Sequence, residues 1–209
     1  FQTYVPRALV SQVMTMDASA TRAANRDVSI LFMDLAGYTR YSEGRSAADV
    51  GDYLNRIFGC VGPIIEAHGG SIDKYTGDGL MAVWGAPAAD AHHAERAWVA
   101  AQAIVAALRE RVAADIAADP AACRIRLGLH SGRVLAGDIG FAGRLDYTVI
   151  GRTVNVAQRA QTALREHMGD AIVALAVTAK MARLLSLPSA RLSPMPALMD
   201  GEGVFRVTD

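Results

Sequence analysis

The sequence predicts a mixed α/β domain, and three observations support that fold class. Apolar runs typical of β-strands alternate along the chain with segments that have the spacing of amphipathic helices. Between residues 71 and 85, a β-branched segment, a Gly-Asp-Gly turn and a second apolar run form the pattern of a β-hairpin. Hydrophobic residues make up 52% of the 209 residues and charged residues 20%, which favours a packed core over disorder. The length suits one domain with extensions.

The composition narrows the function classes. The formal net charge is zero, with 21 basic and 21 acidic residues, so nothing indicates a nucleic-acid or membrane-surface binder. Cys60 and Cys123 lack metal-ligand or redox spacing, and we expect reduced, semi-buried side chains, as in a cytoplasmic protein. No apolar run of about 18 residues predicts a membrane span, and we expect no signal peptide. Because the chain begins with Phe1, we expect an upstream part that carries a sensor or a membrane anchor.

The first half of the chain divides into an extension and the start of the domain. We expect residues 1–25 to form a helix that begins near Pro6, followed by a linker from an upstream module, and 26–209 to form the domain. The nearly continuous apolar run over 26–35 predicts a buried central strand. A helix start follows at 36–39. Longer helices are predicted over 46–68, with Ser46 as its cap and two glycines at its end, and over about 90–117.

The second half predicts further strands and helices. Alternating residues predict a strand over 123–129, and the glycines between 128 and 140 predict a bulged or tightly turned strand pair. The remaining expected elements are strands over 144–150, 171–178 and 204–207, and helices over 151–164 and 179–185.

Two aspartates stand at predicted strand ends. Asp34 ends the first strand just before free backbone amides, an arrangement that suits a cation and phosphates; alternatively, Asp34 only caps the following helix. In the hairpin, Lys74, Thr76 and Asp78 share one face if the strand runs that far. Here the alternative is a surface turn with a solvated lysine.

Five other polar positions have competing interpretations. Asn155 and Arg159 are four residues apart, so they share a helix face and either bind one anion together or form a solvated pair. His130 is an acid/base candidate, although a hydrogen-bonded structural histidine is the favoured interpretation. His92 and His93 are adjacent and point to different helix faces, so we expect an exposed first turn rather than a chelate.

Five segments in a fixed order resemble the catalytic domain of the class III nucleotide cyclases, the adenylyl and guanylyl cyclases. They are Phe32–Thr39, Lys74–Ala82, Gly128–Gly132, Ala136–Gly140 and Tyr147–Arg159. The resemblance covers about residues 26–180, with a weaker tail to 209. It implies a ferredoxin-like domain with a mainly antiparallel sheet and flanking helices, which works as a homodimer through its catalytic face.

The resemblance also implies roles for single residues. Asp34 and Asp78, helped by the carbonyl of Leu35, would bind two divalent cations, Mg²⁺ or Mn²⁺. The amides of Ala36, Gly37, Tyr38 and Thr39 would bind the triphosphate. The partner chain would supply the remaining residues: Lys74 and Thr148 to read adenine, and Asn155 and Arg159 to position ribose and stabilise the transition state. Threonine at position 148 resembles the subgroup often activated by bicarbonate.

The chemistry of cyclisation agrees with these residue types. The ribose 3′-oxygen attacks the α-phosphorus of ATP and expels pyrophosphate, and bound metal ions lower the pKa of the hydroxyl and neutralise phosphate charge. An arginine fork suits the charge that builds up on the phosphoryl oxygens. Lys74 can donate to N1 of adenine and Thr148 can accept from its 6-amino group, so guanine would leave both groups unpaired.

One segment departs from the resemblance. The family usually carries a phosphate-contacting lysine near the C-terminus, whereas residues 192–206 contain none, so Arg191 or Arg206 would have to compensate. The sequence therefore predicts an adenylyl cyclase that makes cyclic AMP, with two alternatives: a catalytically weak or inactive nucleotide-binding or dimerisation module, and a guanylyl cyclase. Lys74 opposes the last of these, because guanine recognition favours an acidic group there.

Overall fold

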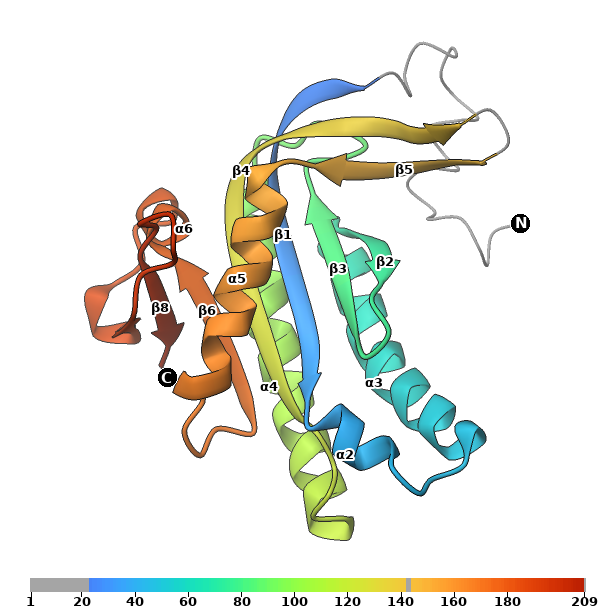
Figure 1. Ribbon diagram of the computed structural model, residues 1–209. Helices are drawn as coiled ribbons and strands as arrows, with labels where there is room; N and C mark the ends of the chain where they lie inside the picture. Colours follow the sequence, from blue (N-terminus) through green and yellow to red (C-terminus); the bar gives the residue numbers. More distant parts are fainter. Residues whose placement is uncertain (1–22, 142–143, 209) are drawn as a thin grey trace.

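A twisted sheet runs through the centre of the molecule. The computed structural model describes residues 23–141 and 144–208, and the order of strands in its sheet is β2-β3-β1-β4-β6-β8-β7, with β5 paired to β4 outside this path (Figure 1). Every pairing is antiparallel except that of β4 with β6. The predicted fold class, a mixed α/β domain with a mainly antiparallel sheet, is confirmed.

The elements follow the sequence pattern closely. The strands are β1 (Ala24–Ala36), β2 (Ser71–Tyr75), β3 (Gly79–Trp84), β4 (Arg124–Phe141), β5 (Arg144–Ile150), β6 (Val173–Thr178), β7 (Leu192–Met195) and β8 (Val204–Val207). The helices are α2 (Tyr38–Ser42), α3 (Ala47–Ala67), α4 (His93–Ala118), α5 (Arg152–His167), α6 (Ala179–Leu184) and the 3₁₀ turn η1 (Ser189–Arg191). Sequence patterns did not predict β7 or η1, and the helix expected near Pro6 lies outside the described residues.

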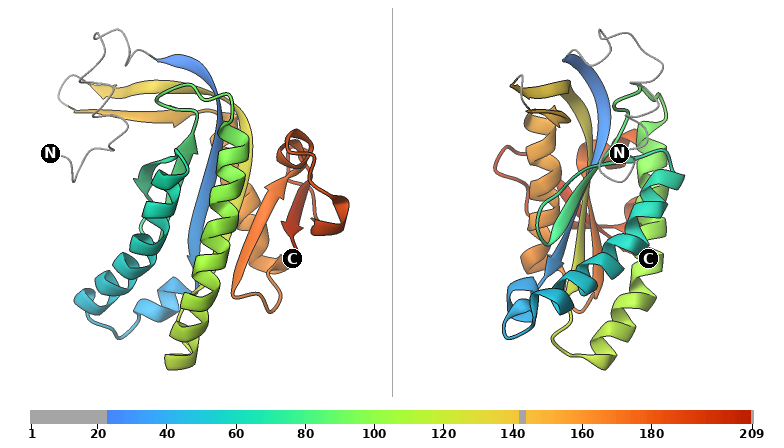
Figure 2. Two further views of the ribbon diagram at one scale, coloured as in Figure 1. Left: turned by 180° about the vertical axis from the view of Figure 1, so that it is seen from behind. Right: turned by 90° about the vertical axis from the view of Figure 1, so that its right-hand side faces the viewer.

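Helices cover both faces of the sheet. In Figures 1 and 2, α3 and α4 lie on one face and α5 on the other. Alternate residues of β1 reach the two sides: Leu31 and Met33 belong to the large apolar cluster beneath α3 and α4, whereas Ile30 and Phe32 belong to a smaller cluster that includes Ala157 of α5. Continued alternation turns Asp34, at the end of β1, toward the α5 face.

The boundaries of α3 have clear local causes. The Ser46 hydroxyl accepts a hydrogen bond from the backbone N–H of Asp49 (3.1 Å), and the same hydroxyl donates to the Asp49 carboxylate (2.7 Å). The predicted cap at Ser46 is confirmed, but the Asp49 carboxylate accepts from the Ser46 hydroxyl, whereas in a capping box it would accept from the Ser46 backbone N–H. At the other end, Gly69 takes a φ of +74° and lets the chain leave the helix. Tyr53, Ile57, Val61 and Ile65 form the buried stripe of the helix.

The prediction of a strand pair at 128–140 is wrong, because β4 runs without interruption from Arg124 to Phe141. The glycines instead allow a helix to come close. A Cβ at Gly128 would lie 2.3 Å from the backbone nitrogen of Gln161, and one at Gly132 would lie 2.7 Å from the Thr153 hydroxyl oxygen. These glycines therefore set the distance between β4 and α5.

The β2–β3 hairpin also differs from the expectation. β2 ends at Tyr75, so Thr76 and Asp78 lie in the turn rather than on a strand face with Lys74. In the turn, Gly77 has a φ of +83°. The register shifts between Ile72, which faces Ala82, and Lys74, which faces Met81, so Asp73 is the extra residue of a β-bulge.

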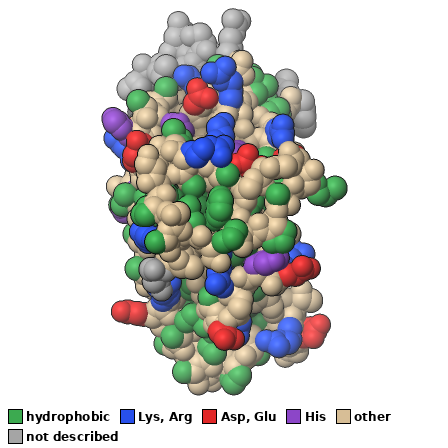
Figure 3. Space-filling model, turned by 90° about the vertical axis from the view of Figure 1, so that its left-hand side faces the viewer, with side chains coloured by type: hydrophobic (Ala, Val, Ile, Leu, Met, Phe, Trp, Pro, Cys, Tyr) green, Lys and Arg blue, Asp and Glu red, His purple; other side chains and the backbone are tan. Residues whose placement is uncertain are grey.

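Two surface properties complete the description. On the side that carries β8 and α6, basic and acidic side chains are intermixed rather than gathered in a field of one sign (Figure 3). No helix in the described part of the chain has the length and apolar character needed to cross a membrane.

Candidate active site

The end of β1 brings the two predicted metal-binding aspartates next to each other. Asp34 pairs in register with Gly79, and the backbone N–H of Leu35 donates to the carbonyl oxygen of Asp78 (3.2 Å). This contact requires a glycine at position 79, because a Cβ there would lie 2.2 Å from the carbonyl oxygen of Met33. The Gly-Asp-Gly turn thus holds Asp78 beside Asp34.

The two carboxylates repel each other. Burial raises the pKa of Asp78 above its ordinary value, and the negative charge of Asp34 raises it further. Asp34 is held from two sides: Arg126, directly opposite on β4, contacts its Oδ2 through the guanidinium, and the Gln161 amide of α5 donates to the same oxygen (3.2 Å). Asp34 is therefore fixed in place, and its negative charge accounts for part of the rise in the pKa of Asp78.

The alternative role of Asp34 as a helix cap is wrong. The N-cap of α2 is Gly37, with a φ of +90° and no side-chain capping bond. Ala36 ends β1, Gly37 is the turn residue, and Tyr38 and Thr39 begin α2; Gly37 and Thr39 are exposed. Their binding of a triphosphate stays a prediction, as does the metal contact expected of the Leu35 carbonyl.

The two predicted base-reading residues meet at one carboxylate. The Thr148 hydroxyl of β5 donates to Oδ2 of Asp73 (2.9 Å), and Nζ of Lys74 lies 3.3 Å from the same oxygen. The Asp73 side chain is only 6% exposed, whereas that of Lys74 is 51% exposed. Burial raises the pKa of Asp73, and the Thr148 hydrogen bond and the Lys74 charge act against that rise. We call Asp73, Lys74 and Thr148 the base-reading cluster.

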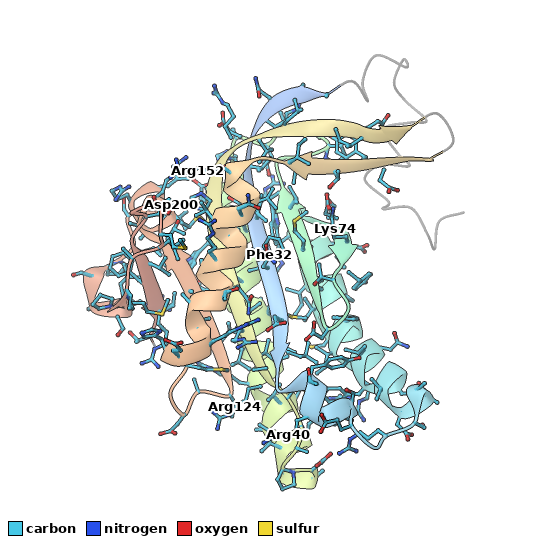
Figure 4. All side chains as sticks on the ribbon, in the orientation of Figure 1. Phe32, Arg40, Lys74, Arg124, Arg152 and Asp200 are labelled. Atoms are coloured by element: carbon cyan, nitrogen blue, oxygen red, sulfur yellow. The ribbon has the colours of Figure 1, made fainter. Side chains whose placement is uncertain are left out.

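The remaining two candidates lie on an exposed face of α5. Asn155 and Arg159 are both exposed, and the Arg159 guanidinium lies 3.9 Å from the Asp200 carboxylate, which Arg152 also contacts at 3.2 Å. Figure 4 shows Arg152 and Asp200 on one side of β1 and Lys74 on the other. Gln161, which reaches Asp34, follows Arg159 by two residues, so the two side chains leave the helix in different directions. Within one chain, Arg159 therefore does not lie beside the carboxylates of Asp34 and Asp78.

The histidines have structural settings. His130 is buried, its Nδ1 lies 2.7 Å from the Thr178 hydroxyl, and burial followed by the Lys180 charge lowers its pKa to about 4. The structural interpretation of His130 is confirmed. His92 is exposed, as expected, but His93 is not: it is half-buried, and its Nδ1 lies 2.9 Å from the Ser29 hydroxyl.

The arginines expected to replace the C-terminal lysine are engaged elsewhere. Arg206 donates to the carbonyls of His167 and Met168 at the end of α5, and Arg191 stacks over the Trp98 ring at 5.8 Å. The turn at 200–201 carries Asp200 instead, whose charge is opposite to that of a lysine.

Sequence reasoning missed three residues of this region: Asp73, Arg126 and Gln161. Arg126 stands opposite Asp34 only once the β1–β4 register is known. Gln161 had a weak signal, because it lies one turn beyond Ala157 on the buried side of α5. Ile72 packs against the large apolar cluster, so alternation turns Asp73 to the other face, but the sequence shows neither that Thr148 lies there nor that a bulge brings Lys74 to the same carboxylate.

The donor set suits a hard cation that keeps other ligands. Among the described residues no group of three or more His, Cys, Asp or Glu side chains is placed to hold a metal ion. Two carboxylates match Mg²⁺, which binds through one or two carboxylates together with water and substrate phosphates. Burial and the charge of Asp34 raise the pKa of Asp78, so a cation between the two groups would be stabilising. The pair therefore fits a metal that arrives with a phosphate ligand.

Comparison with known proteins identifies the family. The family described as the adenylate and guanylate cyclase catalytic domain matches residues 21–190. The chain belongs to this family. Adenylate cyclase 1 of Rhizobium meliloti is 35% identical to this cyclase domain over 181 residues, or 86% of the chain and 27% of that protein. The adenylate cyclase of Anabaena cylindrica is 32% identical over 192 residues, or 90% of the chain and 37% of that protein. The cyclase domain thus spans 27% to 37% of the length of these relatives.

Solved structures share the fold. A bacterial light-regulated adenylyl cyclase superposes with a TM-score of 0.82 at 23% identity, covering 99% of this chain and 59% of that one. A guanylyl cyclase superposes with a TM-score of 0.73 at 26% identity, covering 88% of this chain and 93% of that one. An adenylyl cyclase of P. aeruginosa superposes with a TM-score of 0.71 at 25% identity, covering 90% of this chain and 96% of that one. Because both nucleotide classes occur among similar folds, the choice of base depends on the residues of the site.

Proposed function

We propose that this cyclase domain converts ATP to 3′,5′-cyclic AMP and pyrophosphate at sites shared between the two chains of a homodimer. In this reaction the 3′-oxygen bonds to the α-phosphorus, the bond from that phosphorus to the bridging oxygen breaks, and the 3′-hydroxyl proton passes to solvent. The observation that carries the proposal is the pairing of Asp34 and Asp78 at the end of β1, together with a separate base-reading cluster.

Asp34 and Asp78 would hold the divalent cations. When bound there, Mg²⁺ or Mn²⁺ supplies positive charge against the phosphates and lowers the pKa of the attacking hydroxyl. Arg126 and Gln161 fix the Asp34 carboxylate through Oδ2, so its direction is set before substrate binds. The glycine at 79 keeps the turn, and with it Asp78, close to β1.

Lys74 and Thr148 support adenine as the base. An ammonium group donates to N1 of adenine, whereas N1 of guanine carries its own proton. A hydroxyl next to the ammonium accepts from the 6-amino group. A site with such polar partners rejects the wrong base because its groups would lose their hydrogen bonds on burial.

The geometry of α5 supports a shared site. Arg159 is 49% exposed and lies near Asp200, on a face that does not turn toward Asp34 of the same chain. A partner chain related by two-fold symmetry can present this face to the carboxylates, and the symmetry makes two equivalent sites. Asn155, on the same helix face, would then position the ribose while Arg159 stabilises the transition state.

A direct assay tests the proposal. The purified chain is incubated with ATP or with GTP and with Mg²⁺ or Mn²⁺, and the cyclic nucleotide and pyrophosphate are measured at several protein concentrations. We expect cyclic AMP as the main product and a specific activity that rises with concentration as dimers form. Cyclic GMP as the main product, or no cyclic product at concentrations where the chain is dimeric, would contradict it.

A catalytically weak nucleotide-binding module is the second candidate. It is favoured by the ion pair between Arg159 and Asp200 and by the absence of lysine from 192–206. Titration calorimetry that shows ATP binding without turnover would support it. Responses to bicarbonate or to an upstream regulatory region stay predictions.

A further inference from the structure

Asp73 has a conspicuous position and no assigned role in the reaction. Its side chain is nearly inaccessible, yet it is charged and lies between the two residues proposed to read the base. A buried carboxylate is costly unless hydrogen bonds and opposite charge compensate it. Here one oxygen, Oδ2, receives both the Thr148 hydroxyl and the Lys74 ammonium.

The backbone is shaped to produce this contact. Without the bulge, Asp73 and Lys74 would be successive residues of a regular strand and would point to opposite faces of the sheet. The bulge makes Asp73 the extra residue, leaves Lys74 opposite Met81, and allows Lys74 Nζ to approach Asp73 Oδ2. Thr148 of β5 reaches the same place and donates its hydroxyl to Asp73 Oδ2.

The direction of the Thr148 hydrogen bond decides what this residue can recognise. An ionised carboxylate is only an acceptor, so the single hydroxyl proton of Thr148 is donated to Asp73. The hydroxyl oxygen then keeps only lone pairs for a ligand. Without Asp73, the hydroxyl could rotate and serve as donor or acceptor equally well.

We propose that Asp73 is a positioning residue that makes the cyclase selective for adenine by fixing the polarity of Thr148 and the place of Lys74. Adenine offers an amino donor at position 6 and an acceptor at N1, and both match the fixed groups. Guanine offers a carbonyl acceptor at position 6 and a protonated N1. Its carbonyl would face the lone pairs of Thr148, and its N1 proton would face the Lys74 ammonium. This inference rests on the proposed adenylyl cyclase function and names the origin of its base choice.

The test compares base selectivity, measured as the ratio of kcat/KM for ATP to that for GTP, in Asp73→Asn and in the wild type. Asparagine keeps the size of the side chain but can present an amide donor to Thr148, which frees the hydroxyl proton for a carbonyl at position 6 of guanine. We expect the ratio to fall at least tenfold, mainly because KM for ATP rises and kcat/KM for GTP increases. Asp27→Asn is the matched control, because Asp27 is an exposed carboxylate whose partner, Arg133, is 3.4 Å away, and its ratio should not change.

A double-mutant cycle separates this role from a structural one. Thr148→Val removes the hydroxyl and keeps the shape of the side chain, so it should also lower the ratio. In the Thr148→Val background, Asp73→Asn should change the ratio much less than it does alone, because the group it acts through is gone. Equal effects in both backgrounds would overturn the proposal.

The remaining outcomes are also decisive. If Asp73→Asn makes cyclic AMP with an unchanged ratio, the inference on Asp73 is wrong while the proposed function stands. If the wild type makes no cyclic AMP, the proposed function itself fails. Thermal unfolding monitors folding, and if Asp73→Asn does not fold, Asp73→Ala, which removes the acceptor without adding a donor, is tested in the same way against the same expected fall.

Discussion

The end of β1 and the base-reading cluster place the same kind of side chain in opposite situations. At the end of β1, Asp78 meets a second carboxylate, and its pKa is raised by burial and by the charge of Asp34. In the base-reading cluster, Asp73 is more deeply buried but receives a hydroxyl and an ammonium on one oxygen. Arg126 compensates Asp34, so the uncompensated negative charge at the end of β1 is that of Asp78, whereas the carboxylate of Asp73 already has two partners. The domain thus keeps this uncompensated charge where metal chemistry is proposed.

Removal of either carboxylate at the end of β1 should have the largest effect. In Asp34→Ala or Asp78→Ala, we expect cyclase activity to fall by about a thousandfold or more, because the proposed metal site loses half of its charged ligands. The measurement is cyclic AMP formation with Mn²⁺ at saturating ATP. Full activity in either variant would contradict the metal assignment.

A substitution at Gly128 should disturb the end of β1 and spare the base-reading cluster. A Cβ in Gly128→Ala would lie 2.3 Å from the nitrogen of Gln161, so α5 must move away from β4. We expect about 1–3 kcal/mol of lost stability from overpacking, and roughly a tenfold loss of kcat through the displaced Gln161. Urea unfolding and steady-state kinetics measure the two effects, and the ratio of ATP to GTP use should stay that of the wild type. A changed ratio would show that the two regions are not independent.

Asp78→Asn should stabilise the protein while it inactivates the enzyme. A carboxylate whose pKa is raised on folding binds more protons in the folded state, so its contribution to stability is largest at low pH and is lost as pH rises through the folded-state pKa. At pH 7 without divalent cations, we expect Asp78→Asn to unfold at a temperature ~2–4 °C above the wild type, which corresponds to about 1 kcal/mol. Added Mg²⁺ and ATP should stabilise the wild type more than the variant. A lower unfolding temperature for the variant at pH 7 would mean that the pair is not repulsive.

Sequence patterns predicted the elements better than the contacts between them. The strand that carries Asp34, the cap at Ser46 and the hairpin turn depend on neighbouring residues, so local chemistry was enough to place them. The long β4 strand was mistaken for a strand pair, because its glycines are explained by α5, which is distant in sequence. The meeting of Asp73 with Lys74 and Thr148 depends on the register shift in β2 and on β5, 75 residues away. Candidate residues could therefore be named one by one, while the groups that orient them could not.

The proposal of a shared active site has one direct test, the mixing of two inactive variants. Asp78→Ala keeps Arg159, and Arg159→Ala keeps the carboxylate pair, so a mixed dimer contains one intact site and one site that lacks both groups. With random exchange in an equal mixture, about half of the dimers are mixed and about a quarter of all sites are intact. We expect each variant alone to be nearly inactive and the mixture to regain about a quarter of the wild-type specific activity. Activity that stays at the background level, in a mixture where differently tagged chains are shown to form mixed dimers, would contradict the shared site.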